Sequence, residues 1–433
     1  MDPILLSSLA IVAMFVLIVL HVPIGLSMAT AGVIGFAFMS SFNAAASLLA
    51  SETVTAISSL ELAVVPLFLL MGNFANAAGI SEDFFNLAYA LLGRWRGGLA
   101  MSTVLGNGLF GAVCGSSFAA TATFGRVALP QMRKRGYAAT LAAGCIAAGG
   151  TLSSLIPPSV IMVIYAIMTE QFIVDLFVAA ILPGILTIIA YILAIIIYVR
   201  LDPSASPIAD RQEMSDIVKL ALKSWSSVLL IAIIACGIYG GVFTVTEAAA
   251  LGAILAFLFA IFRKKMTWSV FWQSLSDTAA NSAMIYMIII GAFVLNYFMV
   301  ITHMPEVIAT GIIESGWSVV LTFTVLLFVY IILGSIFDTI AAMLITLPFV
   351  TPIIDAMGYS LVWWGIVNVV IIEIGLITPP IGMNVFVLHG VAKDVSLPTI
   401  FRGIVPFLIA EFVMLTLLMI FPGISTGLLT FFR

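Results

Sequence analysis

Gly115-Ser116-Ser117-Phe118 in the first half of the chain recurs in the second half as Gly334-Ser335-Ile336-Phe337. Four further short motifs follow each stretch in the same order, and matching positions differ by 218 to 223 residues. They are Leu129-Pro130 and Leu347-Pro348, Gly136-Tyr137 and Gly358-Tyr359, Pro157-Pro158 and Pro379-Pro380, and Pro183 and Pro406. Conserved order and spacing indicate an internal duplication. The shared residues include Gly and Pro, which break helices, and they lie within apolar sequence. When such breaks occur at matching positions in two halves of a membrane protein, they point to the binding site of a secondary transporter.

The composition places the chain in a membrane. Hydrophobic residues make up 63% of its 433 residues and charged residues 8%, whereas a soluble domain carries about 25% charged residues. A helix crosses the bilayer with about 20 apolar residues, so the chain is long enough for about ten crossings. The net charge is −4, and the basic residues cluster between apolar runs, which argues against nucleic acid as a partner.

Apolar runs divide the chain into two repeats, 1–200 and 225–433, joined by a polar linker at 201–224 that is expected to be cytoplasmic. Each repeat is predicted to contain five crossing helices and one short amphipathic piece. In the first repeat the helices are expected near 4–20, 22–40, 61–79, 138–168 and 172–199, with the short piece at 81–92. In the second they are expected near 225–241, 247–262, 279–302, 361–391 and 403–422, with the short piece at 305–316.

One further run in each repeat, 98–131 and 318–355, is interrupted in its middle. The interruptions lie at 111–117 and 334–338, and each half looks too short to cross the bilayer. We therefore predict two re-entrant helical hairpins. The exposed backbone of such a tip is tolerated only where it is buried in protein or lines a cavity.

Two observations predict that the repeats are inverted relative to each other. Five crossings is an odd number, so the second repeat starts on the side where the first one ended. Basic residues flank the first hairpin and acidic residues the second; they are Arg94, Arg96 and Arg133-Lys134-Arg135, against Glu306, Glu314 and Asp355. By the positive-inside rule the first hairpin opens from the cytoplasm and the second from outside. Both termini are then outside.

The double prolines lie midway through helices of about thirty residues, 138–168 and 361–391. Proline lacks an N–H and frees carbonyls of the preceding turn, and unwound backbone is a common ligand for the coupling cation of carriers. An ordinary proline kink is the alternative. Hydroxyl groups nearby suit a small hard cation, although Ser and Thr also serve packing between membrane helices. These are Ser116, Ser117, Ser153, Ser154, Ser159, Ser335, Thr339 and Thr378.

Asp338 is the most informative single residue. An acid within an apolar hairpin marks an ion or substrate pathway, and capping of the second hairpin arm is the alternative reading. Glu247 follows a helix start and is expected to cap it. Arg126 either binds an anionic substrate or reaches toward the cytoplasm, and the role of Glu373 is left open.

No phosphate loop of the Gly-x-x-x-x-Gly-Lys-Ser/Thr type occurs, and no catalytic constellation is present. An enzyme is therefore disfavoured. A channel would need a continuous polar pore, and too few polar residues line any one helix for that.

The motifs resemble those of the large membrane subunit of TRAP transporters, the tripartite ATP-independent periplasmic carriers, over essentially the whole chain. They are Val65-Pro66-Leu67-Phe68, Gly115-Ser116-Ser117-Phe118-Ala119, Leu129-Pro130-Gln131-Met132, Ile156-Pro157-Pro158-Ser159, Thr246-Glu247-Ala248-Ala249 and Thr378-Pro379-Pro380-Ile381-Gly382. The chain departs from the family pattern at Val245, where proline is expected.

The resemblance implies sodium-coupled import of a small organic anion, such as a C4-dicarboxylate or sialic acid, across the bacterial inner membrane by an elevator movement. It implies a small four-helix membrane subunit and a periplasmic binding protein as partners. A stand-alone sodium- or proton-coupled carrier remains the alternative.

The resemblance also implies sodium sites where each hairpin tip meets a broken helix, with the substrate beside them. The expected sodium-binding residues are Ser116, Ser117, Pro157, Ser159, Gly334, Ser335, Asp338, Thr378 and Pro379. The expected substrate-binding residues are Ser154, Pro158, Thr339, Pro380, Gly382, Asn384 and Arg126.

Overall fold

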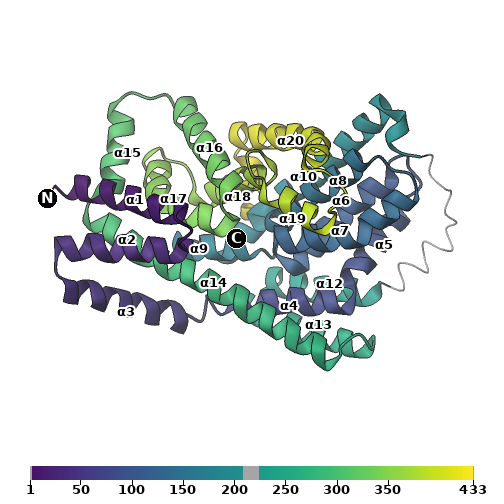
Figure 1. The fold of residues 1–433 in the computed structure, drawn as a ribbon, viewed down its shortest axis with the longest axis horizontal. Coiled ribbons are helices and arrows are strands. Elements are labelled where there is room, and N and C mark those ends of the chain that lie inside the picture. Colours follow the sequence, from purple (N-terminus) through teal and green to yellow (C-terminus); the bar gives the residue numbers. More distant parts are fainter. Residues whose placement is uncertain (1, 208–223, 433) are drawn as a thin grey trace.

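The computed structural model describes residues 2–207 and 224–432, and every regular element within them is a helix (Figure 1). The first half contains α1 (Pro3–Val19), α2 (Ile24–Met39), α3 (Phe42–Ser58), α4 (Val64–Ala78), α5 (Ile80–Leu92), α6 (Gly98–Cys114), α7 (Ser117–Lys134), α8 (Ala139–Leu155), α9 (Val160–Met168), α10 (Ile173–Leu201) and a 3-10 turn (Pro203–Ala205). The second half contains α12 (Trp225–Tyr239), α13 (Val245–Phe262), α14 (Trp268–Ile301), α15 (Met304–Glu314), α16 (Val319–Ile336), α17 (Thr339–Ala356), α18 (Leu361–Ile377), α19 (Met383–Val391), α20 (Leu397–Ile420), α21 (Gly423–Thr426) and α22 (Leu429–Phe432). Most of the expected linker, 201–224, lies outside the described residues.

Both interrupted runs are helical pairs whose breaks lie where the sequence placed them. In the first pair, α6 ends before Gly115, which has φ +61°, and Ser116 caps α7 by accepting a hydrogen bond from the Ala119 amide at 3.4 Å. In the second pair, Asp338 caps α17 through the Ala341 amide at 3.5 Å. The capping role considered for Asp338 is thus present, and it leaves the carboxyl group free to make a second contact.

The length of the hairpin arms differs from the expectation. α6 has 17 residues, and α7, α16 and α17 have 18 each. Eighteen residues of helix extend about 27 Å, close to the bilayer core of about 30 Å. In the second hairpin, α16 and α17 are each long and apolar enough to cross, so their length gives no reason for re-entrance there; α6 and α7 of the first hairpin are not among the candidate spans. By length and composition, six helices of the described residues could span a membrane, or eight if bent pairs count as one. Re-entrance, inversion and ten crossings stay predictions.

Each double proline interrupts a helix, as the sequence predicted. The first separates α8 from α9, which is bent by 41° relative to it, and the second separates α18 from α19. Both Pro-Pro bonds are cis. The broken helices lie in the interior, because nearly every residue of α8 and α18 is buried.

Helices from the two halves pack against each other reciprocally. α2 of the first half packs along α14 of the second, and α13 of the second packs along α4 of the first. In Figure 1, the long α14 runs beneath the hairpins from α2 and α3 toward α4 and α13. This layer of helices supports the hairpins and broken helices on one side.

Two elements of this layer depart from the expected boundaries. α3 was not predicted, because its sequence is rich in Ala, Ser and Thr rather than long apolar side chains; it packs on α2 and α14. α14 begins at Trp268 instead of near 279, since Thr267 caps it by accepting from the Val270 amide at 3.3 Å. Glu247 does cap α13, in a reciprocal capping box with Thr244, as predicted.

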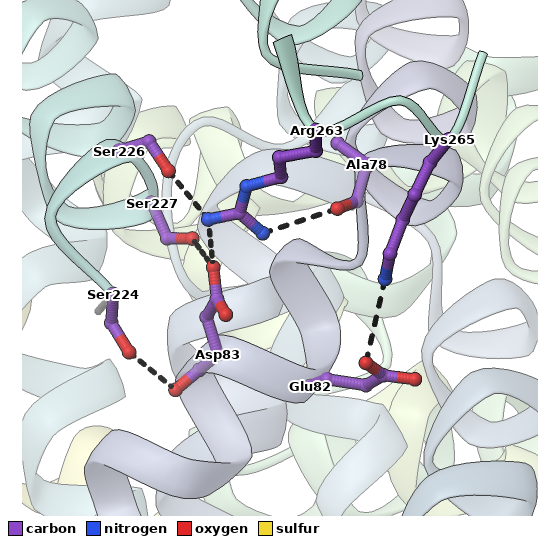
Figure 2. Close-up of polar contacts among 8 residues, drawn as sticks. All are labelled: Ala78, Glu82, Asp83, Ser224, Ser226, Ser227, Arg263 and Lys265. Carbon is purple, nitrogen blue, oxygen red and sulfur yellow. Dashed lines mark hydrogen bonds and ion pairs between the residues drawn. The ribbon is translucent and has the colours of Figure 1, made fainter. Parts of the chain in front are cut away.

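The joint between α4 and α5 is fixed to α12 and α13 by a polar junction (Figure 2). The two helices meet at Gly79 with a bend of 68°. The Arg263 guanidinium, at the end of α13, donates to the Ala78 carbonyl at 3.1 Å, to the Asp83 carboxylate and to the Ser226 hydroxyl at 2.6 Å. Asp83 also accepts from the Ser227 hydroxyl at 2.7 Å.

We predict that Arg263→Ala lowers the free energy of unfolding by about 3 kcal/mol, because it leaves the nearly buried Asp83 carboxylate without its cation. Lys265→Ala is the matched control, since its 3.5 Å pair with Glu82 is exposed and such pairs contribute about 0–1 kcal/mol. Thermal unfolding in detergent measures both. Equal midpoints for the two variants would contradict the role assigned to the junction.

Candidate functional site

A cavity lies where the two hairpin tips face the supporting helices. It has a volume of about 400 Å³. One wall is the tip of the first hairpin with the broken helix α8–α9 and the start of α17, and the other wall comes from α4 and α14. The cavity is therefore enclosed by both halves of the chain.

Five of the residues predicted for the site line this cavity. They are Ser116, Ser117, Ser154, Asp338 and Thr339. Two lining amides, Asn73 on α4 and Asn281 on α14, were missed by the sequence reasoning. An amide inside an apolar helix is itself a signal that could have found them. Asn73 also ties the supporting helices together, because its amide donates to the Thr278 hydroxyl at 2.8 Å.

The charge of the cavity is unusual for a site expected to take an anion. Asp338 is the only ionisable side chain on its wall apart from the Cys114 thiol, and no Lys or Arg is among the lining residues. Positive potential comes from the N-terminal ends of α7 and α17, which begin at the wall, because a helix N-terminus carries a partial positive charge. A bound cation beside Asp338 is the further source of positive charge that this arrangement can accommodate.

Glu373, whose role the sequence analysis left open, connects the two hairpins behind the cavity. Its carboxyl group accepts from the Ser117 hydroxyl at 2.7 Å and from the Thr339 hydroxyl at 3.3 Å. Ser117 and Thr339 are the first helical residues of α7 and α17, the return arms of the two hairpins. Ser117 also meets the Ser154 hydroxyl at 2.7 Å. One carboxyl group thus joins both tips and the first broken helix.

The first proline break lies against the first tip but contributes little to the cavity wall. Pro157, Pro158 and Ser159 are not among the lining residues, whereas the adjacent Val160 is. The Ser159 hydroxyl is buried, and no protein partner for it occurs among the described residues. A buried hydroxyl without a partner is costly, so Ser159 offers an oxygen ligand at this break.

The second break contacts the second tip directly. The Gly382 amide donates to the Ser335 carbonyl at 3.1 Å, which joins the start of α19 to the end of α16. Gly334 and Gly375 touch backbone to backbone: a Cβ on Gly375 would lie 2.7 Å from the carbonyl carbon of Gly334. The Thr378 hydroxyl is bonded within its own helix, to the Ile374 carbonyl at 2.6 Å.

Most of the second-break residues expected in the site lie outside the cavity wall. Gly334, Ser335, Thr378, Pro379, Pro380, Gly382 and Asn384 belong to this group. Asn384 is buried on α19, where its amide nitrogen reaches the Ala147 carbonyl at 3.5 Å and its side-chain oxygen has no partner within the described part of the chain. It is a second available oxygen ligand.

Arg126 is not brought to the cavity. It lies exposed on α7, and its Nε donates to the Ala122 carbonyl at 3.3 Å. It therefore does not contribute to the cavity wall, where an anion-binding role would place it.

The available ligands around the tips are hydroxyl, amide and carboxyl oxygens, and this donor set fits a small hard cation such as sodium. Within residues 2–207 and 224–432 no group of three or more His, Cys, Asp or Glu side chains could hold a metal ion. The site therefore does not have the ligands of a transition-metal centre.

A helical membrane protein in which two hairpin tips and an interrupted helix meet at a cavity has the architecture of a membrane transporter. The profile of the family described as "Tripartite ATP-independent periplasmic transporter, DctM component" matches residues 11–424. The chain belongs to this family, the large permease subunit of TRAP transporters, which confirms the resemblance found in its motifs.

Several characterised relatives extend over most of the chain. The C4-dicarboxylate TRAP transporter large permease protein DctM of Pseudomonas aeruginosa is 35% identical over 368 residues, 85% of this chain and 86% of its own. The sialic acid TRAP transporter large permease protein SiaM of Vibrio cholerae is 30% identical over 375 residues, 86% of this chain and 87% of its own.

The fold is shared with a solved structure of low sequence identity. The YdaH transporter of Alcanivorax borkumensis, whose topology is described as unusual, superposes with a TM-score of 0.63 and 15% identity, covering 88% of each chain. This likeness concerns the fold alone, and it agrees with the all-helical class predicted from the sequence.

We predict that Gly375→Ala forces the second tip away from its broken helix, because the added methyl group meets the backbone of Gly334. Overpacking of this kind costs about 1–3 kcal/mol, and substrate uptake should fall with it. Gly390→Ala on α19 is the control, since nothing lies within 4 Å of its Cβ position. Unfolding midpoints and uptake rates are measured for both; wild-type values for Gly375→Ala would refute the close contact.

Proposed function

We propose that this chain imports a small organic anion across the bacterial inner membrane and that a sodium gradient drives the import. The substrate class that we assign is the carboxylates. C4-dicarboxylates and sialic acid are the members to test first. The observation that carries the proposal is the charge of the cavity, which has one carboxyl group and no basic side chain on its wall.

An anion that enters such a cavity loses its favourable interactions with water, and the protein must provide compensation for this loss. Two helix N-termini supply part of it, and each contributes typically about 0.3–1 kcal/mol at exposed sites. A sodium ion bound by Asp338 and neighbouring oxygens supplies a full charge and removes the repulsion from Asp338. Binding of cation and anion is then mutually favourable, and by linkage each raises the affinity of the other.

Relatives support the choice of substrate class. The printed names of three of them refer to C4-dicarboxylate, sialic acid and isethionate. All three are small oxyanions, and the cavity of about 400 Å³ falls within the range of about 300–1,000 Å³ typical of small-molecule sites. Arg126 lies outside the wall, so we do not include it in anion binding.

Membership of this family also supports the proposal that the chain works together with two other proteins. We propose that a small four-helix membrane subunit packs against this chain and that a periplasmic binding protein delivers the substrate. The two broken helices and two hairpins then move as one body past the layer that contains α4 and α14, in an elevator movement. This assignment is supported by the position of the cavity, because it lies between that body and that layer.

Uptake of labelled succinate and sialic acid into proteoliposomes tests the proposal. The vesicles hold this chain with or without its small subunit, and the assay is run with and without a sodium gradient and with and without the binding protein. Uptake that requires the small subunit, the gradient and the binding protein supports a tripartite sodium-driven importer. Sodium-driven uptake by this chain alone would establish a stand-alone carrier, and a non-saturating flux would establish a channel.

We predict that Asp338→Asn raises the sodium concentration for half-maximal uptake by tenfold or more, because a bond to a charged group contributes about 1.5–3 kcal/mol. Asparagine still caps a helix, so α17 should remain intact. Asp355→Asn, exposed near the end of the same helix, is the control and should leave the sodium dependence unchanged. An unaltered sodium dependence in Asp338→Asn would exclude Asp338 from the cation site.

A further inference from the structure

Two carboxyl groups lie deep in the protein behind the cavity. Glu373 on α18 and Glu411 on α20 each have an exposed fraction of 2%. Among the residues that the structure describes, neither forms an ion pair with Lys, Arg or His. Removing an ionised carboxylate from water costs several kcal/mol even after relaxation. Two unpaired acids in this position therefore need a ligand that neutralises charge.

Both side chains line one small void. Its other lining residues are Thr151, Leu152, Leu155 and Val370, and it is too narrow to hold a water molecule. None of the lining residues is basic, so the two acids share this space without a compensating cation. Like charges held together in this way favour retention of a proton by the pair.

The hydrogen bonds leave one oxygen free to take that proton. Glu411 Oε1 accepts from the Tyr191 hydroxyl and from the Thr151 hydroxyl at 3.3 Å. Glu411 Oε2 is buried and has no protein partner within the described residues. The residue that carries this free oxygen lines the void together with Glu373.

The groups around the pair supply no positive charge. Tyr191 on α10 is the titratable group that contacts it directly, and Ser117, Ser154 and Thr339 present hydroxyls from α7, α8 and α17. Glu373 is the only titratable residue of α18, and Asp338 lies beyond Thr339 on the cavity side. The pair is consequently a purely acidic site enclosed by neutral donors.

We propose that Glu373 and Glu411 form a proton-binding site that is separate from the cation site at Asp338. A metal ion does not fit, because hard cations take about six or more oxygen ligands and the void does not admit even one water molecule. A proton needs no such space. It rests on one oxygen of either carboxyl group.

A chain of hydroxyl groups connects this site to the cavity. Glu373 Oε2 meets the Ser117 hydroxyl at 2.7 Å, Ser117 meets the Ser154 hydroxyl at 2.7 Å, and both serines line the cavity. Each hydroxyl can donate one hydrogen bond and accept others. A proton carried by Glu373 passes to the Ser117 oxygen, the Ser117 proton passes to Ser154, and the Ser154 proton leaves to water in the cavity. The reverse sequence reloads the pair.

Infrared difference spectroscopy of the whole chain in nanodiscs tests the site without sodium or substrate. A protonated carboxyl group has a carbonyl stretching band that its carboxylate lacks. We expect the wild-type protein to show such a band and to lose it as the pH rises. Glu373→Gln and Glu411→Gln should each remove or shift the band. Glu247→Gln is the control and should leave the band unchanged. Glutamine can still form the exposed capping box of α13, so the helix should be kept.

A band that is unchanged in both buried glutamine variants, or no pH-dependent band in the wild type, would overturn the proposal. Ser117→Ala provides a second measurement if a glutamine variant fails to fold: the band should remain and its deuterium exchange should slow several-fold. Exchange at the wild-type rate would remove the hydroxyl chain from the proposal. Because no transport is measured, these results stand apart from the outcome of the uptake assay.

Discussion

The structure depends most on the contact between each hairpin tip and the broken helix beside it. At the second tip, Gly334 and Gly375 bring two backbones together, and the Gly382 amide bonds to the Ser335 carbonyl. These contacts hold interrupted backbone in the interior, where unsatisfied polar groups are costly. The same contacts leave oxygen atoms and helix ends directed at one place. The cavity lies beside these contacts, and its wall includes the residues that follow each tip, at the starts of α7 and α17.

Glu373 adds a link between the two tips that neither repeat contains alone. The hydroxyls it binds, on Ser117 and Thr339, come from the same position in the two hairpins. A change at one tip therefore alters a hydrogen bond that also positions the other. This geometry gives a direct physical route by which the occupancy of one half of the site can influence the other half.

Much of the fold could be predicted because breaker residues have strong local effects. Gly115 and Asp338 lie within the predicted breaks of the two hairpins, and both double prolines interrupted their helices. These effects act over one helical turn and are visible in sequence. α3 was missed because its polar and small residues become helical through contacts with α2 and α14, which hydropathy does not report.

The part of the candidate site that lies at the hairpin tips could be predicted because breaker residues mark the tips. Residues at the tips, such as Ser117 and Asp338, are marked by the breaks themselves. Asn73 and Asn281 reach the cavity only because α4 and α14 pack opposite the tips, and that arrangement depends on distant parts of the chain. The role of Glu373 likewise requires three other helices to meet it. The position of a residue in the sequence does not show which distant helices meet around it in the fold.

The polar junction at Arg263 makes the two repeats mechanically unequal. It fixes the turn between α4 and α5 to the end of α13, and α5 lies along the first hairpin arm α6. Among the described residues, none of the ion pairs lies at the corresponding turn between α14 and α15, at Thr302 and His303. The first hairpin therefore has a polar attachment to the supporting helices, through α5, for which the second hairpin has no ionic counterpart among the described residues.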